Sequence, residues 1–187
     1  SDQARYSDAE VLFLRALQNQ EKTLGPETLA VAATLNMLSI GYQEEGRYNE
    51  AESVLRRALA IREKILDPKH PKLAPVLNNL AVLYKHLGQL AKSENLLQRV
   101  LSILETSLGH EHPDVANVLG NLADVYSRQQ RESEAEHLER RALKIWENTL
   151  GPNHPLVSSI HHNMSISAEE KGMYGKAIKS RRRTTSI

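Results

Sequence analysis

The sequence predicts an all-α fold, a solenoid of stacked antiparallel helix hairpins, for three reasons. One unit recurs every 42 residues without a gap, as the equivalent positions of Tyr6, Tyr48 and Tyr174 show. Each unit holds two apolar helical stripes with a turn between them. The units also share a closing leucine, at Leu24, Leu66, Leu108 and Leu150. A period of this length is typical of repeat architectures in which each unit packs against its neighbours.

The best-formed hairpin is expected within residues 71–108. Pro71 suits the first turn of a helix, because its missing N–H would have no partner inside the helix at that position. The apolar residues that follow recur at steps of three and four, which indicates one buried helical face; they are Leu73, Val76, Leu77, Leu80, Ala81 and Tyr84. Gly88 allows a left-handed end to this helix, and a second apolar stripe begins at Leu90. The unit is therefore two helices joined by a tight turn.

Along the chain, the same pattern predicts one array over residues 1–187 with nine helices. A partial repeat, 1–28, holds a lone second helix at about 7–24. Full repeats follow at 29–70, 71–112, 113–154 and 155–187, with hairpins at 29–66, 71–108, 113–150 and 155–183. In the last hairpin Ser180 and Arg181 replace apolar residues, so we expect a C-terminal cap or a fraying end. Because the chain begins partway through a repeat, we expect further repeats upstream in the parent protein.

Two details of the hairpins carry specific expectations. The second helices hold a small residue at Ala51, Ser93 and Ala135, which lets each of them approach its first helix closely. Glycine marks most of the turns, but Gln130 replaces it in the repeat 113–154. A residue with a side chain is strained in the left-handed conformation, so this turn is expected to be strained.

Composition and charge narrow the classes of function. The chain has 187 residues, 40% of them hydrophobic, and a formal net charge of +1. This balance offers no overall field for nucleic acid or lipid, so we expect neither nucleic-acid binding nor membrane insertion. No apolar run approaches the length of a membrane span. The chain has no cysteine, which excludes disulfides and thiolate metal sites and permits a cytoplasmic location.

The residues of the first helix and turn resemble the tetratricopeptide repeat. The match consists of a spaced motif, Leu77, Leu80, Ala81, Tyr84, Gly88 and Leu90, and it covers nearly the whole chain. The 42-residue length and the linker 150–155 are similar to those of the kinesin light chain and nephrocystin-3 subgroup. The resemblance implies a right-handed superhelix whose concave face, lined by first helices, receives extended peptides, often acidic or aromatic. It further implies a protein-interaction scaffold, a cargo adaptor of the kinesin light chain type, in the cytoplasm and with the cytoskeleton.

Residues about 100° and 200° around the first helix from its buried stripe should face the concave groove. The predicted peptide-binding residues are Asn36, Asn78, Asn79, Val82, Lys85, Asn121, Asp124, Arg128, His162 and Asn163. An asparagine amide can hold both the N–H and the C=O of an extended peptide, so a ladder of asparagines suits a peptide track. The alternative is that these asparagines bond to neighbouring helices and satisfy buried polar groups.

Charged and aromatic positions add further expectations. Lys85 and Arg128 lie near the ends of first helices, where they would meet a ligand carboxylate or belong to a solvated face. Trp146 replaces smaller or polar residues on a second helix and is expected to pack between repeats. Gly120, in the middle of a first helix, would leave room for a ligand backbone or a close helix neighbour.

The spacing of the histidines and the absence of catalytic motifs in the sequence argue against a metal site and an enzyme. The linker histidines, His70, His112 and His154, lie one repeat apart, roughly 10 Å by helix stacking, so they cannot share a metal ion and should serve the linker instead. The sequence contains no glycine-rich phosphate loop and no arrangement of a serine or cysteine nucleophile, so we expect no enzyme and no cofactor.

Two other functions fit a repeat array of this kind. One is a structural or self-associating array, in which the exposed end helix pairs with another copy of the chain. The other is a regulatory arm of a larger multidomain protein. The lone first helix of the chain motivates self-association, and only the full-length sequence tests the regulatory arm.

Overall fold

The computed structural model describes residues 2–152, 154, 155 and 157, and within them it confirms the predicted all-α solenoid. The elements are α1 (Asp2–Leu24), α2 (Leu29–Glu44), α3 (Tyr48–Ile65), the short 3-10 helix η1 (Pro71–Leu73), α4 (Ala74–His86), α5 (Leu90–Leu108), α6 (Pro113–Arg128) and α7 (Glu132–Leu150). The lone second helix α1 begins several residues before the expected start at 7. The predicted hairpin 155–183 lies outside the described residues.

Side-chain caps explain where the first helices begin. The Nδ1 atom of His70 accepts a hydrogen bond from the backbone N–H of Lys72 at 3.1 Å, and His112 does the same for Asp114 at 3.1 Å. These histidines therefore occupy the position where serine, threonine, asparagine or aspartate usually caps a helix. Thr28 caps α2 through its hydroxyl instead. The expected linker role of the first two histidines is confirmed.

The turns inside the hairpins use the left-handed backbone conformation. Gly46 and Gly88 have φ angles of +73° and +71°. Gln130 occupies the equivalent place with a φ angle of +63°. Among the described residues, it is the one residue other than glycine that has a positive φ. Because a Cβ atom clashes with the backbone in this conformation, the prediction of strain at Gln130 is confirmed.

Small residues at the crossing of the two helices allow close packing, as expected. Ala51 and Ser93 are fully buried and Ala135 is 1% exposed. The Ser93 hydroxyl donates a hydrogen bond to the carbonyl of Ala81 at 2.7 Å, so its polar atom is satisfied inside the hairpin. The core runs continuously through the described hairpins, because side chains such as Leu96 contact the apolar clusters on both sides.

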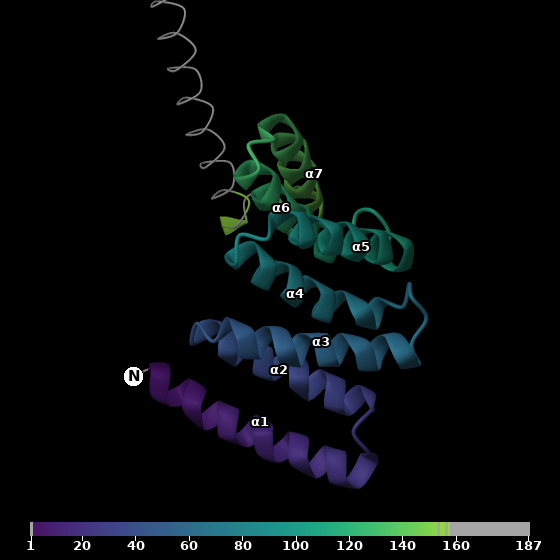
Figure 1. The fold of residues 1–187 in the computed structure, drawn as a ribbon. Helices are drawn as coiled ribbons and strands as arrows, with labels where there is room; N and C mark the ends of the chain where they lie inside the picture. Colours follow the sequence, from purple (N-terminus) through teal and green to yellow (C-terminus); the bar gives the residue numbers. More distant parts are fainter. Residues whose placement is uncertain (1, 153, 156, 158–187) are drawn as a thin grey trace, which may run out of the picture.

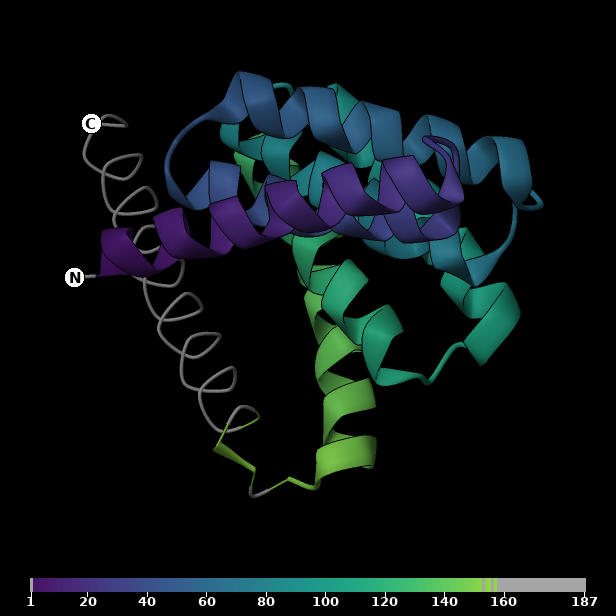
Figure 2. The same cartoon turned by 90° about the horizontal axis from the view of Figure 1, so that it is seen from below.

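The hairpins stack side by side and turn as they rise from α1 to α7 (Figure 1). Seen from below, α6 and α7 run across the direction of α1, which shows the superhelical twist of the array (Figure 2). The first helices contact one another across repeats, α2 with α4 and α4 with α6. They form the inner face of the right-handed solenoid, and the second helices form the outer face.

Charged pairs connect successive second helices at regular intervals. Arg57 contacts Glu21 at 2.6 Å, Arg99 contacts Glu63 at 2.6 Å, and Arg141 contacts Glu105 at 2.5 Å. Each arginine reaches back by nearly one repeat. Exposed pairs of this kind contribute little individually, and their recurrence shows that the three interfaces share one register.

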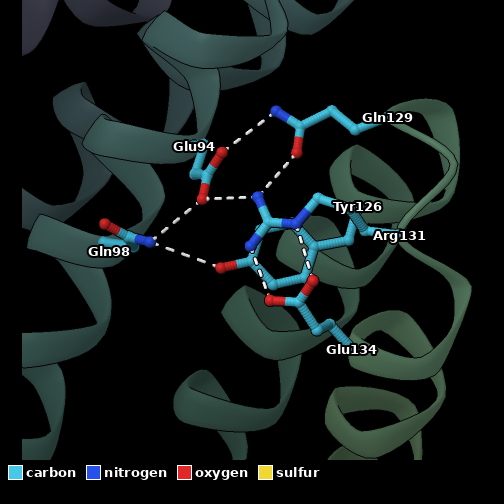
Figure 3. A network of polar contacts seen from close by, with 6 residues as sticks. All are labelled: Glu94, Gln98, Tyr126, Gln129, Arg131 and Glu134. Carbon is cyan, nitrogen blue, oxygen red and sulfur yellow. Dashed lines mark hydrogen bonds and ion pairs between the residues drawn. The ribbon is translucent and has the colours of Figure 1, made fainter.

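A second recurrent network lies at the turn between first and second helices (Figure 3). The Arg131 guanidinium lies 3.9 Å above the ring of Tyr126 and contacts Glu94 of the preceding repeat at 2.9 Å and Glu134 at 2.6 Å. Burial disfavours the charged form of Glu94, but hydrogen bonds from Gln129 and Arg131 outweigh it and lower its pKa. Arg47 makes the equivalent contacts with Tyr42 and Glu10 two interfaces earlier.

Candidate functional site

The asparagines of the inner face form pairs that join successive first helices. The Nδ2 atom of Asn79 donates to the Oδ1 atom of Asn36 at 3.1 Å, linking α4 to α2. Asn121 donates to Asn78 in the same way at 3.2 Å, linking α6 to α4. The alternative expected for these residues, bonding to neighbouring helices, is therefore part of their role. The pairs also show that position 79 faces the preceding repeat and position 78 faces the following one.

Each asparagine pair keeps one donor and one acceptor that its internal bond does not use. These are the Nδ2 atoms of Asn36 and Asn78 and the Oδ1 atoms of Asn79 and Asn121. Within the described part of the chain, the Nε atom of Arg62 is the one buried side-chain polar atom without a hydrogen-bond partner. None of these four amide atoms is both sealed from solvent and unpaired, although Asn36 as a whole is 8% exposed. This count does not depend on how each amide is oriented, since reversing both members of a pair again leaves one donor and one acceptor.

The two cations expected to meet a ligand carboxylate already have a carboxylate partner. Lys85 Nζ lies 2.6 Å from Asp124 Oδ2, and Arg128 Nε lies 3.0 Å from Asp124 Oδ1. Burial disfavours the charged form of Asp124, but the hydrogen bonds from Lys85 and Arg128 outweigh it, so the Asp124 pKa is lowered. A ligand carboxylate at this place would have to compete with Asp124. The half-buried side chain of Val82 lies on the same helix, α4.

A cavity of about 370 Å³ opens beside the second asparagine pair, between the N-terminal halves of α4 and α6. Its walls include Pro71, Pro75, Asn78, Leu104, Asn117 and Asn121. Leu104 comes from α5 and forms part of its floor. The cavity therefore combines amide groups at its rim with an apolar interior, the usual composition of a site that binds a small apolar group in a defined orientation.

The sequence interpretation did not identify Leu104 or Asn117 as part of this site. The available signal was the repeat itself, because position 104 corresponds to Gln20, Arg62 and Trp146 and changes in size and charge from unit to unit. Trp146 lies against α6, its Cη2 atom 3.8 Å from where a Cβ of Gly120 would stand. The expectation that Gly120 leaves room for a close helix neighbour fits this contact.

A smaller, almost entirely apolar cavity of about 160 Å³ lies at the other end of the array, between α1 and α2. It is lined by Phe13, Met37, Ile40 and Gly41 among others. Met37 is 46% exposed and Ile40 is 40% exposed. Leu12 on α1 is also 65% exposed, and these exposed apolar side chains of α1 and α2 are called the apolar end surface below.

Other classes of site were considered for the same residues. Within the described ranges, no group of three or more histidine, aspartate or glutamate side chains is arranged to hold a metal ion. The helices described here include none that is long and apolar enough to cross a membrane. The predicted site residues His162 and Asn163 lie outside the part of the chain that the structure describes.

The fold and the inner groove define a helical-repeat scaffold, and comparison with known proteins identifies its family. The model of the tetratricopeptide repeat matches residues 1–64, 38–106 and 72–148. The chain belongs to the tetratricopeptide repeat family, whose repeats are non-catalytic scaffolds for protein interaction. A search among curated proteins found no significant match.

Solved structures with the same fold include repeat proteins of the kinesin light chain type. A Podosopora anserina protein described as a kinesin light chain with nearly identical TPR-like repeats is 27% identical, with a TM-score of 0.75, and the alignment covers 94% of this chain and 83% of that one. BtubC (BKLC) from P. vanneervenii is 23% identical with a TM-score of 0.68, covering 86% and 65% of the two chains. The first TPR of Spaghetti (RPAP3), bound to the HSP90 peptide SRMEEVD, is 17% identical with a TM-score of 0.52, covering 74% and 93%.

Proposed function

We propose that the chain binds a short extended segment of a partner protein in the groove formed by α2, α4 and α6. The observation that carries this proposal is the pair of unused amide groups, one donor and one acceptor, at each junction between first helices. An extended peptide presents N–H and C=O groups that require this combination. The amides would hold the main chain of the ligand without reading its side chains.

The spacing of the amide pairs also suits an extended chain. Neighbouring packed helices lie roughly 8–10 Å apart, and an extended peptide advances about 3.3–3.6 Å per residue. One junction therefore corresponds to about three residues of the ligand. At the junction of α4 and α6, the cavity beside Leu104 would receive one apolar side chain of the bound segment.

Two of the comparisons support this proposal. A tetratricopeptide unit with the same fold, the first TPR of Spaghetti (RPAP3), is described as bound to a short peptide. The likeness to kinesin light chain repeats supports the finer proposal of a cargo adaptor, which would act in the cytoplasm beside the cytoskeleton. Asn78, Asn79 and Asn121 would hold the ligand in either case, together with Asn36.

Paired alanine substitutions test the assignment of the asparagines. A peptide array probed with the purified chain supplies the ligand, and titration calorimetry then compares Asn79→Ala, Asn121→Ala and the double variant. Each substitution removes one free acceptor and one internal bond, so each should weaken binding several-fold, and together roughly tenfold or more, at about 0.5–1.5 kcal/mol per hydrogen bond. Asn95→Ala on the exposed face of α5 is the matched control and should bind normally.

The outcome of this experiment is decisive only if the variants fold. Circular dichroism and thermal unfolding should show the helical content of the parent chain in all of them. Unchanged affinity of the folded double variant would exclude the asparagines as the peptide-holding groups. An array on which the wild-type chain retains no peptide would contradict the proposed function itself.

Self-association is the second candidate function, and the apolar end surface favours it. Met37 and Ile40 are exposed beside the small cavity between α1 and α2, and Leu12 is exposed on α1. Burial of such a surface against another copy would be favourable. Sedimentation velocity over a range of concentrations separates the two functions. A species that stays monomeric at all concentrations contradicts self-association, and dimers that dissociate on Leu12→Glu substitution support it.

A further inference from the structure

One position of the second helix contacts a first helix, or lines a cavity between first helices, in three of the described repeats. The Oε1 atom of Gln20 on α1 accepts a hydrogen bond from Thr34 of α2 at 2.8 Å. Leu104 on α5 lines the cavity between α4 and α6, and Trp146 on α7 contacts α6. Arg62 on α3 occupies the same position one repeat before Leu104. The hydrogen bond from Arg62 to the carbonyl of Lys72 in η1 shows that its side chain likewise reaches the start of the first helix that follows.

Arg62 differs from the other arginines of the array in its surroundings. Arg62 is 9% exposed. Of the buried residues that the structure describes, it is the one with a charged side chain. Its Nη1 atom donates to the backbone carbonyl of Lys72 in η1. Its Nε atom is buried without a partner, and no carboxylate lies within ion-pair distance of it in the described part of the chain. Burial lowers the pKa of the guanidinium, although an arginine stays charged at neutral pH.

A buried cation without a counter-ion is unfavourable, and a fully folded protein rarely keeps one without a reason. Arg57, Arg99 and Arg141 on the outer face each contact a glutamate, so the array provides partners elsewhere. The Nη2 atom of Arg62 makes no hydrogen bond within the described residues. It keeps some contact with solvent, because Nε of the same side chain is the one described side-chain polar atom that is both buried and without a partner. The guanidinium therefore has one open end.

We propose that Arg62 binds a carboxylate of the partner segment on the groove floor between α2 and α4. This inference rests on the proposed peptide-binding function and specifies its ligand chemistry. The Nη2 atom at the open end can donate charge-assisted hydrogen bonds to a carboxylate, and the low polarity of the site strengthens them. The carboxylate belongs either to an aspartate or glutamate side chain or to the C-terminus of the segment. Arg62 thus performs the acid recognition expected of Lys85 and Arg128, which Asp124 already neutralises.

The proposal distinguishes a ligand-binding Arg62 from a structural one. If its role were only the bond to the Lys72 carbonyl, Arg62→Leu would lower the thermal unfolding midpoint of the free protein. If Arg62 instead serves to bind a ligand carboxylate, then replacing it by leucine, the residue at the equivalent position 104, removes a buried cation that has no counter-ion in the free protein. The unliganded Arg62→Leu variant should then unfold at the same temperature as the parent or higher.

Binding is measured with array peptides synthesised in matched forms. Each peptide carries either glutamate or glutamine at every acidic position, and either a free or an amidated C-terminus. The wild-type chain should prefer one carboxylate over its amide by about tenfold or more. Loss of the preference on glutamine substitution identifies a side-chain carboxylate, and loss on amidation identifies the C-terminus. In Arg62→Leu the preference should disappear, with the amide form bound as before.

Two further variants complete the test. Arg99→Leu, which removes an arginine from the outer face, should leave the carboxylate preference intact. Arg62→Lys keeps the positive charge but lacks the planar guanidinium, so it should keep part of the carboxylate preference. This variant replaces Arg62→Leu in the binding test if Arg62→Leu is poorly folded. A carboxylate preference that persists in folded Arg62→Leu, or a wild-type chain that binds both forms equally through its asparagines, overturns the role of Arg62 and leaves the peptide-binding function standing. If no peptide binds, both proposals fall.

Discussion

Replacement of Gln130 by glycine should stabilise the array. The size of the gain in the free energy of unfolding follows from one backbone angle. Gln130 has φ +63°, close to the +71° of Gly88 at the equivalent turn. The left-handed conformation costs a residue with a Cβ atom about 1–2 kcal/mol. Gln130 is exposed, and no side-chain bond of it is seen among the described residues, so the substitution sacrifices no contact.

Glycine also gains conformational freedom in the unfolded chain, which offsets about 0.4–1 kcal/mol of this benefit. The net stabilisation should be about 0.5–1 kcal/mol, which corresponds to roughly 1–4 °C in the unfolding midpoint of a chain of this size. Differential scanning calorimetry and guanidinium titration measure it. The reverse change, Gly88→Gln, should destabilise by a similar amount, because a Cβ at Gly88 meets no atom within 4 Å and only the backbone strain changes. A midpoint that falls in Gln130→Gly would refute the argument.

Two further predictions concern the groove. Leu104→Trp introduces the side chain found at Trp146 and should fill the cavity between α4 and α6, so array peptides should bind at least several-fold more weakly while the unfolding midpoint changes little. Asp124→Asn releases Lys85 and Arg128 from their shared partner, and acidic peptides should then bind more tightly in calorimetric titration. The same substitution should alter the pH dependence of stability. The Asp124 pKa is lowered in the folded chain, so its contribution is present above the unfolded pKa and is lost as pH falls through the folded pKa. Acid titrations of unfolding should therefore be flatter in Asp124→Asn, and identical slopes would contradict the pairing.

The repeat pattern was sufficient to predict the fold but not the partners of the groove residues. The period of 42 residues predicted the order of helices, and the end of α3 and both ends of α5 agree with prediction to about one residue. It also located the strained turn at Gln130, because that position is compared directly with glycines in other copies. Each of these inferences depends on local backbone geometry, which a repeat reports faithfully.

The contacts between repeats depend instead on how one hairpin is rotated against the next. Asn79 reaches back to Asn36 and not to Met37, its own equivalent, so the pairs are offset by one position from the repeat. The tilt that produces this offset is a property of packed side chains along the whole interface. For the same reason, the sequence could not show that Asp124 lies between two cations, nor that an arginine at position 62 is buried.

In the proposed site, recognition would be divided between constant and variable positions of the inner face. The asparagine pairs recur at both described junctions and offer the same donor and acceptor, whereas the floor beneath them changes from Arg62 to Leu104. Main-chain binding would therefore be uniform along the groove, and the floor would set the order of side chains in the ligand. Exchange of the two residues, Arg62→Leu with Leu104→Arg, tests this division directly.

The exchanged chain keeps its composition and both amide pairs, so its overall affinity for peptides should remain within a few-fold of the parent. Its preferred carboxylate should move by one junction, which is about three residues along an extended peptide. A peptide series in which a single glutamate is shifted one residue at a time measures this displacement. If the preferred position stays where it was in the parent chain, the floor does not select the side chains, and the acidic preference arises from Lys85 and Arg128 or from the rim. If the position moves, the residue at the floor of each junction determines which side chain that junction accepts.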